Sequence, residues 1–485
     1  RGAESRLRPQ ESHMERLTYI ARERGRLSVS GAPGGYDAYL AAEAAMRRKG
    51  LVVFVAADDA HAAAAADAMR FFAPKVSVLP FPAWDCLPYD RTSPKSDIES
   101  QRLATLAALA RRGKDDAPAI VVTTVNAILQ RVPPISEIAK ASFFARVGND
   151  VEHDVLTAFL VKNGYVKAST VREPGDFALR GGIVDLWPPG SEQPLRLDFF
   201  GATLDAIRTF DAETQLSSDR IHEIELLPAS EAPLDAESIS RFRSGYVATF
   251  GPATSDDNLY ESVSAGRKMQ GMEHWLPLFH DHLDTLFDYA PDALVMLSHQ
   301  TEEAKTARLE LVKDYYETRR QFLREKREGE AKVSAPPYKP LPPEKLYLTD
   351  AEWNAALASR DARELSPFQA PESMRAVDAG GKQGRDFAPE RAQGKVNIFQ
   401  IAADHIGELL KAKKRVLVAT WSNGSAERIG GLLSDHGIGA IRQVDNWSEA
   451  AKLHDDAVGV AVLGLERGIE VADFAIVSEQ DILGD

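Results

Sequence analysis

The pattern of apolar and polar residues divides the chain into stretches of different character. Between residues 25 and 141, short apolar runs alternate with longer stretches of helical character. The runs at 51–55, 76–79 and 119–123 contain no charged residue, which is typical of strands buried on both faces of a sheet. The alanine-rich stretch at 36–49 predicts a helix. Strands and helices in alternation predict a parallel α/β domain at 25–141.

The pattern changes at 142–228. Apolar segments are shorter here and are separated by turn residues, including Gly181-Gly182 and Pro188-Pro189-Gly190. Apolar and polar residues alternate at 195–200, as they do in a strand with one buried face. This pattern predicts a small α+β insert domain with an antiparallel sheet.

Mixed α/β character returns at 229–350. A buried strand is predicted at 293–297, where the chain could return to the first sheet, and a long charged helix follows at 301–332. Residues 229–350 are therefore interpreted as a second part of the first α/β domain.

Three further segments complete the predicted organisation. Residues 1–24 begin with a polar stretch and are expected to be a disordered or tag-like N-terminus. Residues 351–392 are interpreted as a linker, because 365–392 is rich in Gly, Pro and charge. Residues 393–485 carry three apolar strands and are predicted to form a separate small α/β domain, which ends soon after a strand, as a truncated protein would.

The composition limits the functions that the chain can perform. Hydrophobic residues make up 44% of the 485 residues, and the formal net charge is −14. A protein that grips duplex DNA over its whole surface is usually basic, so any contact with nucleic acid should be local. The single cysteine, Cys86, allows no intramolecular disulfide and fits a reducing, cytoplasmic compartment. The sequence has no apolar run of about 18 residues, so no membrane-spanning helix is expected.

A glycine-rich turn follows the first predicted strand, at the position where ATPases bind phosphate. Gly31, Gly34 and Gly35 lie between this strand and a helix. A working loop needs a Lys that reaches the phosphates and a Ser or Thr that holds Mg²⁺. Tyr36 and Asp37 follow the glycines instead, and Gly-Lys-Thr or Gly-Lys-Ser occurs nowhere in the sequence. The turn is interpreted as a non-functional phosphate loop whose helix is capped by Asp37.

A second motif of helicase-type ATPases is degenerate as well. In such enzymes an apolar strand ends in acidic residues that hold the metal, whereas 294–297 continues into Ser298, His299 and Gln300. Two degenerate motifs in the expected order predict a helicase-like fold that has lost ATPase activity. The sequence has no Cys/His cluster with metal-ligand spacing, so we expect no catalytic residue, metal or cofactor in this chain. An active ATPase or helicase remains the alternative.

A proline-rich corner combines aromatic and acidic residues. Trp84 and Tyr89 could stack on bases, but nearby acids would repel nucleic acid. We therefore interpret the two aromatic side chains as packing residues. The acids have no fixed ligand spacing and are interpreted as a solvated face: Asp85, Asp90, Asp97 and Glu99.

Two arginines and a phenylalanine in the predicted antiparallel sheet form the last candidate site. Arg180 lies at a turn beside a strand, and Arg196 and Phe200 are separated by an even number of residues, so they share one strand face. Arginine pairs with carboxylates through two parallel hydrogen bonds, and aromatic residues anchor protein interfaces. From the residues alone, two interpretations stay open: a partner-binding face, or ordinary surface arginines with a core phenylalanine.

Several long motifs resemble those of the bacterial transcription-repair coupling factors (the Mfd family), in their N-terminal, UvrB-like half. The resemblance runs from residue 25 to the end of the chain and is weakest between 330 and 395. The motifs that carry it are 84–90 (WDCLPYD), 180–188 (RGGIVDLWP), 194–200 (PLRLDFF), 226–229 (LLPA), 271–279 (GMEHWLPLF) and 478–484 (SEQDILG).

The resemblance implies a domain organisation. Residues 25–141 (domain 1a) and 229–350 (domain 1b) would be similar to the helicase-like domains of the excision-repair protein UvrB. Residues 142–228 would form a UvrA-binding domain 2, and 393–485 a small α/β domain 3 of unclear purpose. Coupling factors keep the UvrB-like fold but not its ATP site. The segment between Tyr89 and Ile98 leaves little room for the hairpin with which UvrB clamps damaged DNA.

The resemblance also implies a function, namely recruitment of UvrA to RNA polymerase stalled at DNA damage, in transcription-coupled nucleotide excision repair. Arg180, Arg196 and Phe200 match the residues that contact UvrA in the family. RNA polymerase, DNA, ATP and Mg²⁺ would bind to C-terminal domains outside this chain, and the motor half would mask the UvrA-binding face until the motor engages. The alternatives are a UvrB-like protein that binds damaged DNA and a scaffold with no UvrA contact.

Overall fold

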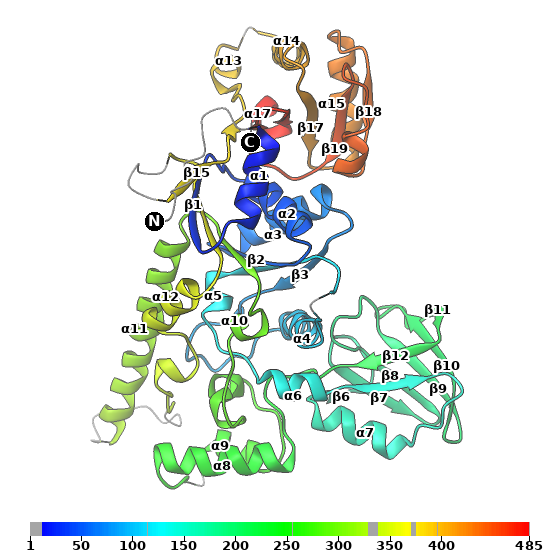
Figure 1. The fold of residues 1–485 in the computed structure, drawn as a ribbon. Helices are drawn as coiled ribbons and strands as arrows, with labels where there is room; N and C mark the ends of the chain where they lie inside the picture. The colour runs from blue at the N-terminus through cyan, green and yellow to red at the C-terminus, as the bar shows by residue number, and fades with distance from the viewer. Residues whose placement is uncertain are drawn as a thin grey trace.

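A seven-stranded parallel sheet forms the centre of the structure, a computed structural model that describes residues 12–113, 115–254, 256–327, 338–369, 375–394 and 396–484. The strand order is β15-β1-β14-β13-β2-β4-β3, and β1, β2, β3 and β15 are labelled in Figure 1. The strands are β1 (Arg26–Ser30), β2 (Leu51–Ala56), β3 (Ser77–Phe81), β4 (Ala119–Thr124), β13 (Leu294–Leu297), β14 (Ala362–Leu365) and β15 (Ala376–Asp378). The predicted parallel sheet is confirmed, and it takes three of its strands from later segments of the chain.

Helices cover both faces of this sheet. On β2, Val52 and Phe54 enter one core while Val53 and Val55 enter the other, since successive side chains of a strand point to opposite faces. The helices that close the first core are α1 (His13–Arg22), α2 (Tyr36–Arg48) and α3 (Asp59–Phe72). Those that close the second are α4 (Ser96–Ala110), α5 (Val125–Ile128), α6 (Ile135–Lys140), α10 (Leu286–Tyr289) and α12 (Asp350–Ala358).

Residues 351–392 are not the linker that their composition predicted. Helix α12 buries Trp353 in the second core, and β14 and β15 pair with the two edges of β1. Further along, β16 (Lys382–Gln383) joins the last sheet by pairing with β20 (Ile469–Glu470). The prediction failed because these strands have only four, three and two residues, which is too short for a detectable periodicity.

The expectation of a disordered or tag-like segment at 1–24 is also corrected, because α1 begins at His13. The Ser12 hydroxyl accepts a hydrogen bond from the Glu15 amide (3.3 Å), and the Glu15 carboxylate accepts one from the Ser12 amide (2.8 Å). Leu17 and Ile20 are buried in the first core. The helix escaped prediction because only three of its residues are buried. Residues 1–11 lie outside the described residues.

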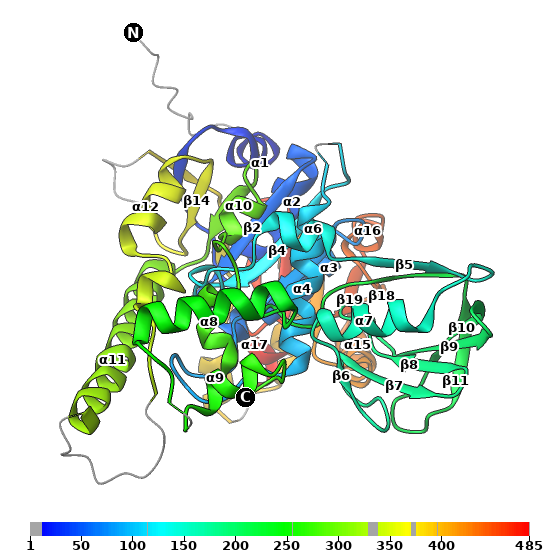
Figure 2. The same cartoon turned by 90° about the horizontal axis from the view of Figure 1, so that it is seen from below.

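The insert forms a sheet of its own, in the order β11-β10-β9-β8-β7-β6, and all neighbours except β6 and β7 are antiparallel. Its strands are β6 (Val166–Lys167), β7 (Asp176–Arg180), β8 (Ile183–Leu186), β9 (Leu195–Phe200), β10 (Thr203–Phe210) and β11 (Ser217–Ile221). The inner face packs on α7 (His153–Lys162) in a separate core. A two-stranded ribbon, β5 (Phe143–Arg146) with β12 (Glu223–Leu226), lies beside it. In both views the unit stands to one side of the central sheet (Figures 1 and 2).

A separate aromatic core is formed by a group of helices and the loops next to them. The helices are α8 (Ala236–Phe250), α9 (Asn258–Ser264), η1 (Met272–Leu278), η2 (Pro343–Lys345) and α11 (Thr301–Arg327). Trp84 and Tyr89 are 7% and 2% exposed in this core, so their prediction as packing residues is confirmed. The predicted helix at 301–332 is described as far as Arg327, and the rest of it lies outside the described residues.

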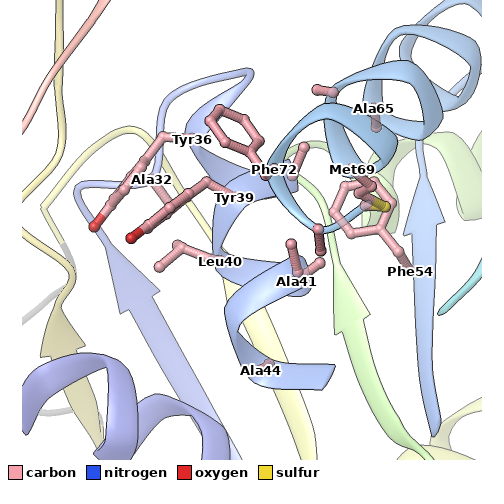
Figure 3. Close-up of a cluster of buried hydrophobic side chains, with 14 of the residues drawn as sticks. Ala32, Tyr36, Tyr39, Leu40, Ala41, Ala44, Phe54, Ala65, Met69 and Phe72 are labelled. Carbon is pink, nitrogen blue, oxygen red and sulfur yellow. The ribbon is translucent and has the colours of Figure 1, made fainter. Parts of the chain in front are cut away.

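The last unit has its own sheet, β16-β20-β21-β17-β19-β18, but it shares a core with the first. Its elements are α13 (Ala388–Ala392), α14 (Ile398–Lys411), β17 (Arg415–Thr420), α15 (Asn423–Asp435), β18 (Ile441–Gln443), α16 (Trp447–Ala450), β19 (Val458–Val462), β21 (Phe474–Ser478) and α17 (Glu479–Leu483). Helices α14 and α15 cover one face of the sheet. The other face packs on α2 and α3, whose Tyr36, Tyr39 and Phe72 are drawn in Figure 3. The predicted separate domain is therefore joined to the first unit by a continuous apolar core.

Candidate functional site

The outer face of the insert sheet carries the three predicted partner-binding residues. Directly paired residues of neighbouring strands point to the same side of a sheet, and the pairs Arg180–Ile183 and Ile183–Asp198 connect β7, β8 and β9. On β9, Arg196 and Phe200 lie two positions before and after Asp198, so they share its side. Apolar residues of the opposite side pack on α7. The structure thus brings Arg180, Arg196 and Phe200 together on the face turned away from α7.

Phe200 is the most solvated of these side chains. It ends β9, just before the turn to β10, and is 85% exposed. Its neighbour Phe199 is the partly buried one, packed against the core of the insert. The alternative that Phe200 is a core residue is therefore wrong. A nearly fully solvated phenylalanine on a regular strand is typical of an interface anchor.

Arg180 is exposed at the end of β7. One of its guanidinium nitrogens, Nη2, donates to the Ser169 carbonyl (2.7 Å) and to the Thr170 hydroxyl (3.1 Å). Both acceptors are uncharged, and no ion pair of Arg180 is found within the described part of the chain. Its positive charge is therefore uncompensated on the outer face.

Arg196, by contrast, already has a carboxylate partner within the chain. Its Nε and Nη2 donate to the two carboxylate oxygens of Asp185, at 2.7 and 3.0 Å. Its Nη1 donates to the Gln215 carbonyl (3.3 Å) and the Ser217 hydroxyl (3.2 Å), and its guanidinium lies 4.8 Å from the centre of the Phe210 ring. The hydrogen bond with Asp185 raises the pKa of Arg196 further. The expected pairing of Arg196 with a partner's carboxylate therefore has an internal competitor.

Sequence reasoning missed Asp185 and two further arginines on this face. Asp185 is 2% exposed and lies directly opposite Arg196 in the β8–β9 register. Arg208 lies opposite both Arg196 and Arg220, on β10. The available signal was a single acid within the otherwise apolar strand 183–186, but its partner could be named only once the register was known.

The degenerate phosphate loop lies between β1 and α2, with Gly31 and Gly35 in the left-handed region at φ 61° and 85°. The carboxylate of Asp37 accepts hydrogen bonds from the amides of Gly35 (2.9 Å) and Ala38 (2.8 Å). Its other oxygen lies 2.8 Å from Nε2 of His61. Asp37 thus binds amides at the start of the helix, as expected, although it does so from the second helical position.

The last unit covers this loop. A Cβ atom placed on Gly35 would lie 2.9 Å from Leu465 and 3.0 Å from Ile469. Gly34, in contrast, has open space at its Cβ position. A phosphate bound at such a loop needs free amides and a polar surrounding. Here an internal carboxylate occupies amides of the helix start, and apolar side chains lie against the turn.

The residues after β13 are also engaged within the chain. The hydroxyl of Ser298 accepts a hydrogen bond from the Ala57 amide at 3.2 Å. The first acid, Glu302, accepts one from Trp353 Nε1 at 3.1 Å and forms an ion pair of 2.7 Å with Lys305. Both positions where a helicase-type ATPase holds phosphate and metal are thus used for internal contacts.

One of the acids predicted to lie on a solvated face is buried instead. Glu99 is 3% exposed, and Nζ of Lys268 donates to its carboxylate at 3.0 Å. Burial raises the pKa of Glu99, because desolvation penalises the charged form. Nearby on α4, Arg102 forms a fully buried ion pair with Glu231, which follows the insert. In the described ranges, no group of three or more His, Cys, Asp or Glu residues is arranged to hold a metal ion.

Comparisons with known proteins match the insert and most of the chain. The family model of the UvrB interaction domain matches residues 144–231, which include the whole antiparallel sheet. The chain is 30% identical over 459 residues to a transcription-repair-coupling factor of Haemophilus influenzae, and 31% identical over 457 residues to that of Escherichia coli K12. Each match covers 93% of this chain and 37% of the relative. The protein of the same name from Bacillus subtilis is 29% identical over 235 residues, which is 46% of this chain and 20% of the relative.

The folds and the matched domain define a multidomain α/β protein of DNA repair with a UvrB interaction domain. The chain belongs to the transcription-repair coupling factor family, as its motifs predicted. It spans only 37% of the length of the two relatives that it matches over most of its own length. Across the described residues, no helix has the length and apolar character needed to cross a bilayer.

Proposed function

We propose that this chain recruits the damage-recognition ATPase UvrA through the outer face of the insert sheet. The observation that carries the proposal is Phe200, which is 85% exposed on the domain that matches the UvrB interaction family. Arg180 on the same face adds an uncompensated positive charge. An exposed ring beside cationic side chains suits a partner surface with an apolar pocket and carboxylates at its rim.

Recruitment requires no chemistry in this chain. The contacts of Asp37 and Leu465 at the degenerate phosphate loop support the proposal that this part of the protein binds no nucleotide. In the longer parent protein, ATP and Mg²⁺ act in a DNA-translocating motor outside this chain, and RNA polymerase and DNA bind there as well. That motor half masks the outer face of the insert until it engages, and the assembly works in the cytoplasm.

The alternative of a UvrB-like protein that binds damaged DNA has less support. Trp84 and Tyr89, the aromatic residues that could stack on bases, are buried in the aromatic core. A net charge of −14 also disfavours binding to a polyanion. A gel-shift with lesion-containing DNA separates the two functions, because a recruitment module needs no affinity for the lesion.

Binding of purified UvrA tests the proposal. The chain should bind, and a variant with Arg180, Arg196 and Phe200 all changed to Ala should not, provided that it remains folded. Phe200→Ala alone should weaken binding by about 2 kcal/mol or more, since the ring is the central anchor. This corresponds to a dissociation constant raised about 30-fold.

The matched control is Phe144→Ala. Phe144 is 56% exposed and lies on β5 of the same unit, outside the insert sheet. It should leave binding unchanged. Equal losses from both phenylalanine variants would mean that the face has been wrongly assigned, and no binding by the unmodified chain would reject UvrA recruitment.

A further inference from the structure

Helix α4 of the central unit makes polar contacts with several parts of the insert. The Ser100 hydroxyl accepts a hydrogen bond from the Gly190 amide, between β8 and β9, at 3.0 Å. Near the other end of the helix, Arg111 forms an ion pair of 2.7 Å with Glu225 on β12. The insert therefore rests on α4 at points that are far apart in the sequence.

The segment that leaves the insert is bound to α4 as well. The Ser230 hydroxyl donates to the carboxylate of Glu99, in the first turn of α4, at 3.4 Å. Glu231 forms an ion pair with Arg102, one turn further along, and both side chains are fully buried. Removing one partner of a buried ion pair leaves an uncompensated charge, which is strongly unfavourable. The start of α4 and the end of the insert are therefore expected to open together.

Glu99 also belongs to a buried group that reaches η1. Nζ of Lys268 lies 3.0 Å from the Glu99 carboxylate and 3.7 Å from the carboxylate of Glu273, so the two acids share one lysine. Glu99 and Glu273 are 3% and 0% exposed. The Ser93 hydroxyl donates to one oxygen of Glu273 at 2.6 Å, whereas the other oxygen, Oε1, has no hydrogen-bond partner among the described residues.

The charges of this buried group do not balance. Three carboxylates lie beside two cations, so the fully ionised group carries one excess negative charge: Glu99, Glu231 and Glu273 against Arg102 and Lys268. An unpaired charge is very costly in the interior of a protein. One bound proton would make the group neutral.

The neighbouring titratable groups do not supply a compensating charge. Burial, followed by the charge of Glu273, raises the pKa of the Cys86 thiol to about 12, so the thiol is neutral. Burial lowers the pKa of His274 to about 4, so its ring is neutral near pH 7. His280 contacts the Glu231 carbonyl at 2.8 Å, but its other ring nitrogen lies 2.7 Å from the carboxylate of Glu137. The acids that share Lys268 are therefore the groups that can take up the proton.

We propose that Glu99 and Glu273 form a proton-binding site that controls how firmly the insert is held on α4. With one proton bound, the buried group is neutral, and Glu99 can bond to both Lys268 and Ser230. When the proton leaves, the two carboxylates repel each other across Lys268, and opening of the first turn of α4 to water relieves the repulsion. The end of the insert opens with this turn, whether or not the insert binds UvrA.

The direction of the pH dependence follows from the burial of the two acids. Burial is the largest cause that raises the pKa of Glu99, from 4.5 to about 7, and it raises the pKa of Glu273 as well. In the opened form both carboxyls meet water and titrate near their ordinary values. The closed form therefore holds an extra proton between about pH 4.5 and pH 7, so its stability relative to the opened form falls as the pH rises through this range and is constant above it. This titration belongs to the pair of acids, because they share one lysine.

Hydrogen exchange of the full chain at pH 6 and pH 8 tests the proposal, with rates corrected for the pH dependence of unprotected amides. The equilibrium constant for opening of 96–104 and 228–233 should rise about tenfold from pH 6 to pH 8, as expected for a site that titrates near pH 7. Strand β17, in the last unit, should show no such rise. Glu99→Gln is uncharged at both pH values and leaves one carboxylate for Lys268, so the rise should disappear.

The matched control is Asp97→Asn, the same change from acid to amide at an exposed position in the same turn of α4. This variant should keep the tenfold rise. If Glu99→Gln does not fold, Glu273→Gln replaces it and should also abolish the rise, because Lys268 then neutralises the acid that remains. The inference would be overturned by the absence of a rise in the unmodified chain, by a rise that persists in the Gln variant, or by its loss in Asp97→Asn.

Discussion

His274 is a buried histidine that should make the fold sensitive to acid. It is 2% exposed in the aromatic core, and burial lowers its pKa from 6.5 to about 4. The folded state therefore binds the proton less tightly than the unfolded chain does. Above pH 6.5 His274 is neutral in both states, and the free energy of unfolding keeps its full value. As the pH falls toward the folded-state pKa, the unfolded chain gains a proton and the free energy of unfolding decreases, by about 2 kcal/mol at pH 4.5.

Urea unfolding at pH 7.5 and pH 4.5 measures this contribution. The unmodified chain should lose about 2 kcal/mol more between the two pH values than His274→Asn does. The control is His222→Asn, at an exposed position after β11. If both variants lose as much stability as the unmodified chain, protonation of His274 does not couple to folding.

At the scale of residues, the sequence predicted which side chains share a face of the sheet, but not which of them already have a partner within the chain. Arg196 and Phe200 could be assigned to one face because strand side chains alternate, and the structure agrees. The pairing of Arg196 with Asp185 depends on the register across β8 and β9, which the irregular connection between the two strands does not reveal. For the same reason Glu99, in a charged segment, could not be recognised as buried, since Lys268 lies far away in the sequence.

At the scale of elements, the contact between β21 and α2 should couple the stability of the last unit to that of the first. Phe474 is 3% exposed, and its ring centre lies 5.1 Å from that of Tyr39 and 4.7 Å from that of Trp447. Phe474→Ala should cost about 3–5 kcal/mol, because it leaves a cavity between the two sheets. It should also speed hydrogen exchange in α2, although the substitution itself is in another unit.

The matched variant is Phe387→Ala. Phe387 is also fully buried in the last unit, but in the core formed with α14 and α15 on the other face. Hydrogen exchange measured by mass spectrometry should show a larger change in 36–48 for Phe474→Ala than for Phe387→Ala. Equal exchange in the two variants would contradict the shared core.

Strands whose own residues are mostly apolar could be predicted from the sequence. Strands that can be recognised only by the neighbour with which they pair could not. The runs in β2 and β4 contain no charged residue and are mostly apolar, so burial on both faces identifies them without knowledge of their neighbours. In contrast, β15 has an exposed–buried–exposed pattern over three residues and is recognisable only because it pairs with β1. For this reason residues 351–392 were predicted to be a linker, although β14 and β15 within this segment complete the central sheet.

At the scale of the whole molecule, the insert should be separable from the rest, unlike the last unit. Its core is drawn entirely from residues between 143 and 229. The two members of the buried ion pair, Arg102 and Glu231, both lie outside this range, so a fragment of 142–229 contains neither charge without its partner. Such a fragment should fold cooperatively, with lower stability than the full chain because a small domain buries a smaller share of its surface.

If recruitment depends only on the outer face of the sheet, the 142–229 fragment should bind UvrA within about threefold of the full chain, since both present the same residues in the same geometry.

Titration calorimetry on both, together with the longer parent protein in its resting state, also tests whether the motor half masks this face. Masking predicts that the parent binds more weakly than either shorter form, because only the fraction of molecules with an open face can bind. Equal affinity of all three would contradict masking but keep recruitment. A folded fragment that does not bind would show that the central sheet or the last unit supplies part of the interface.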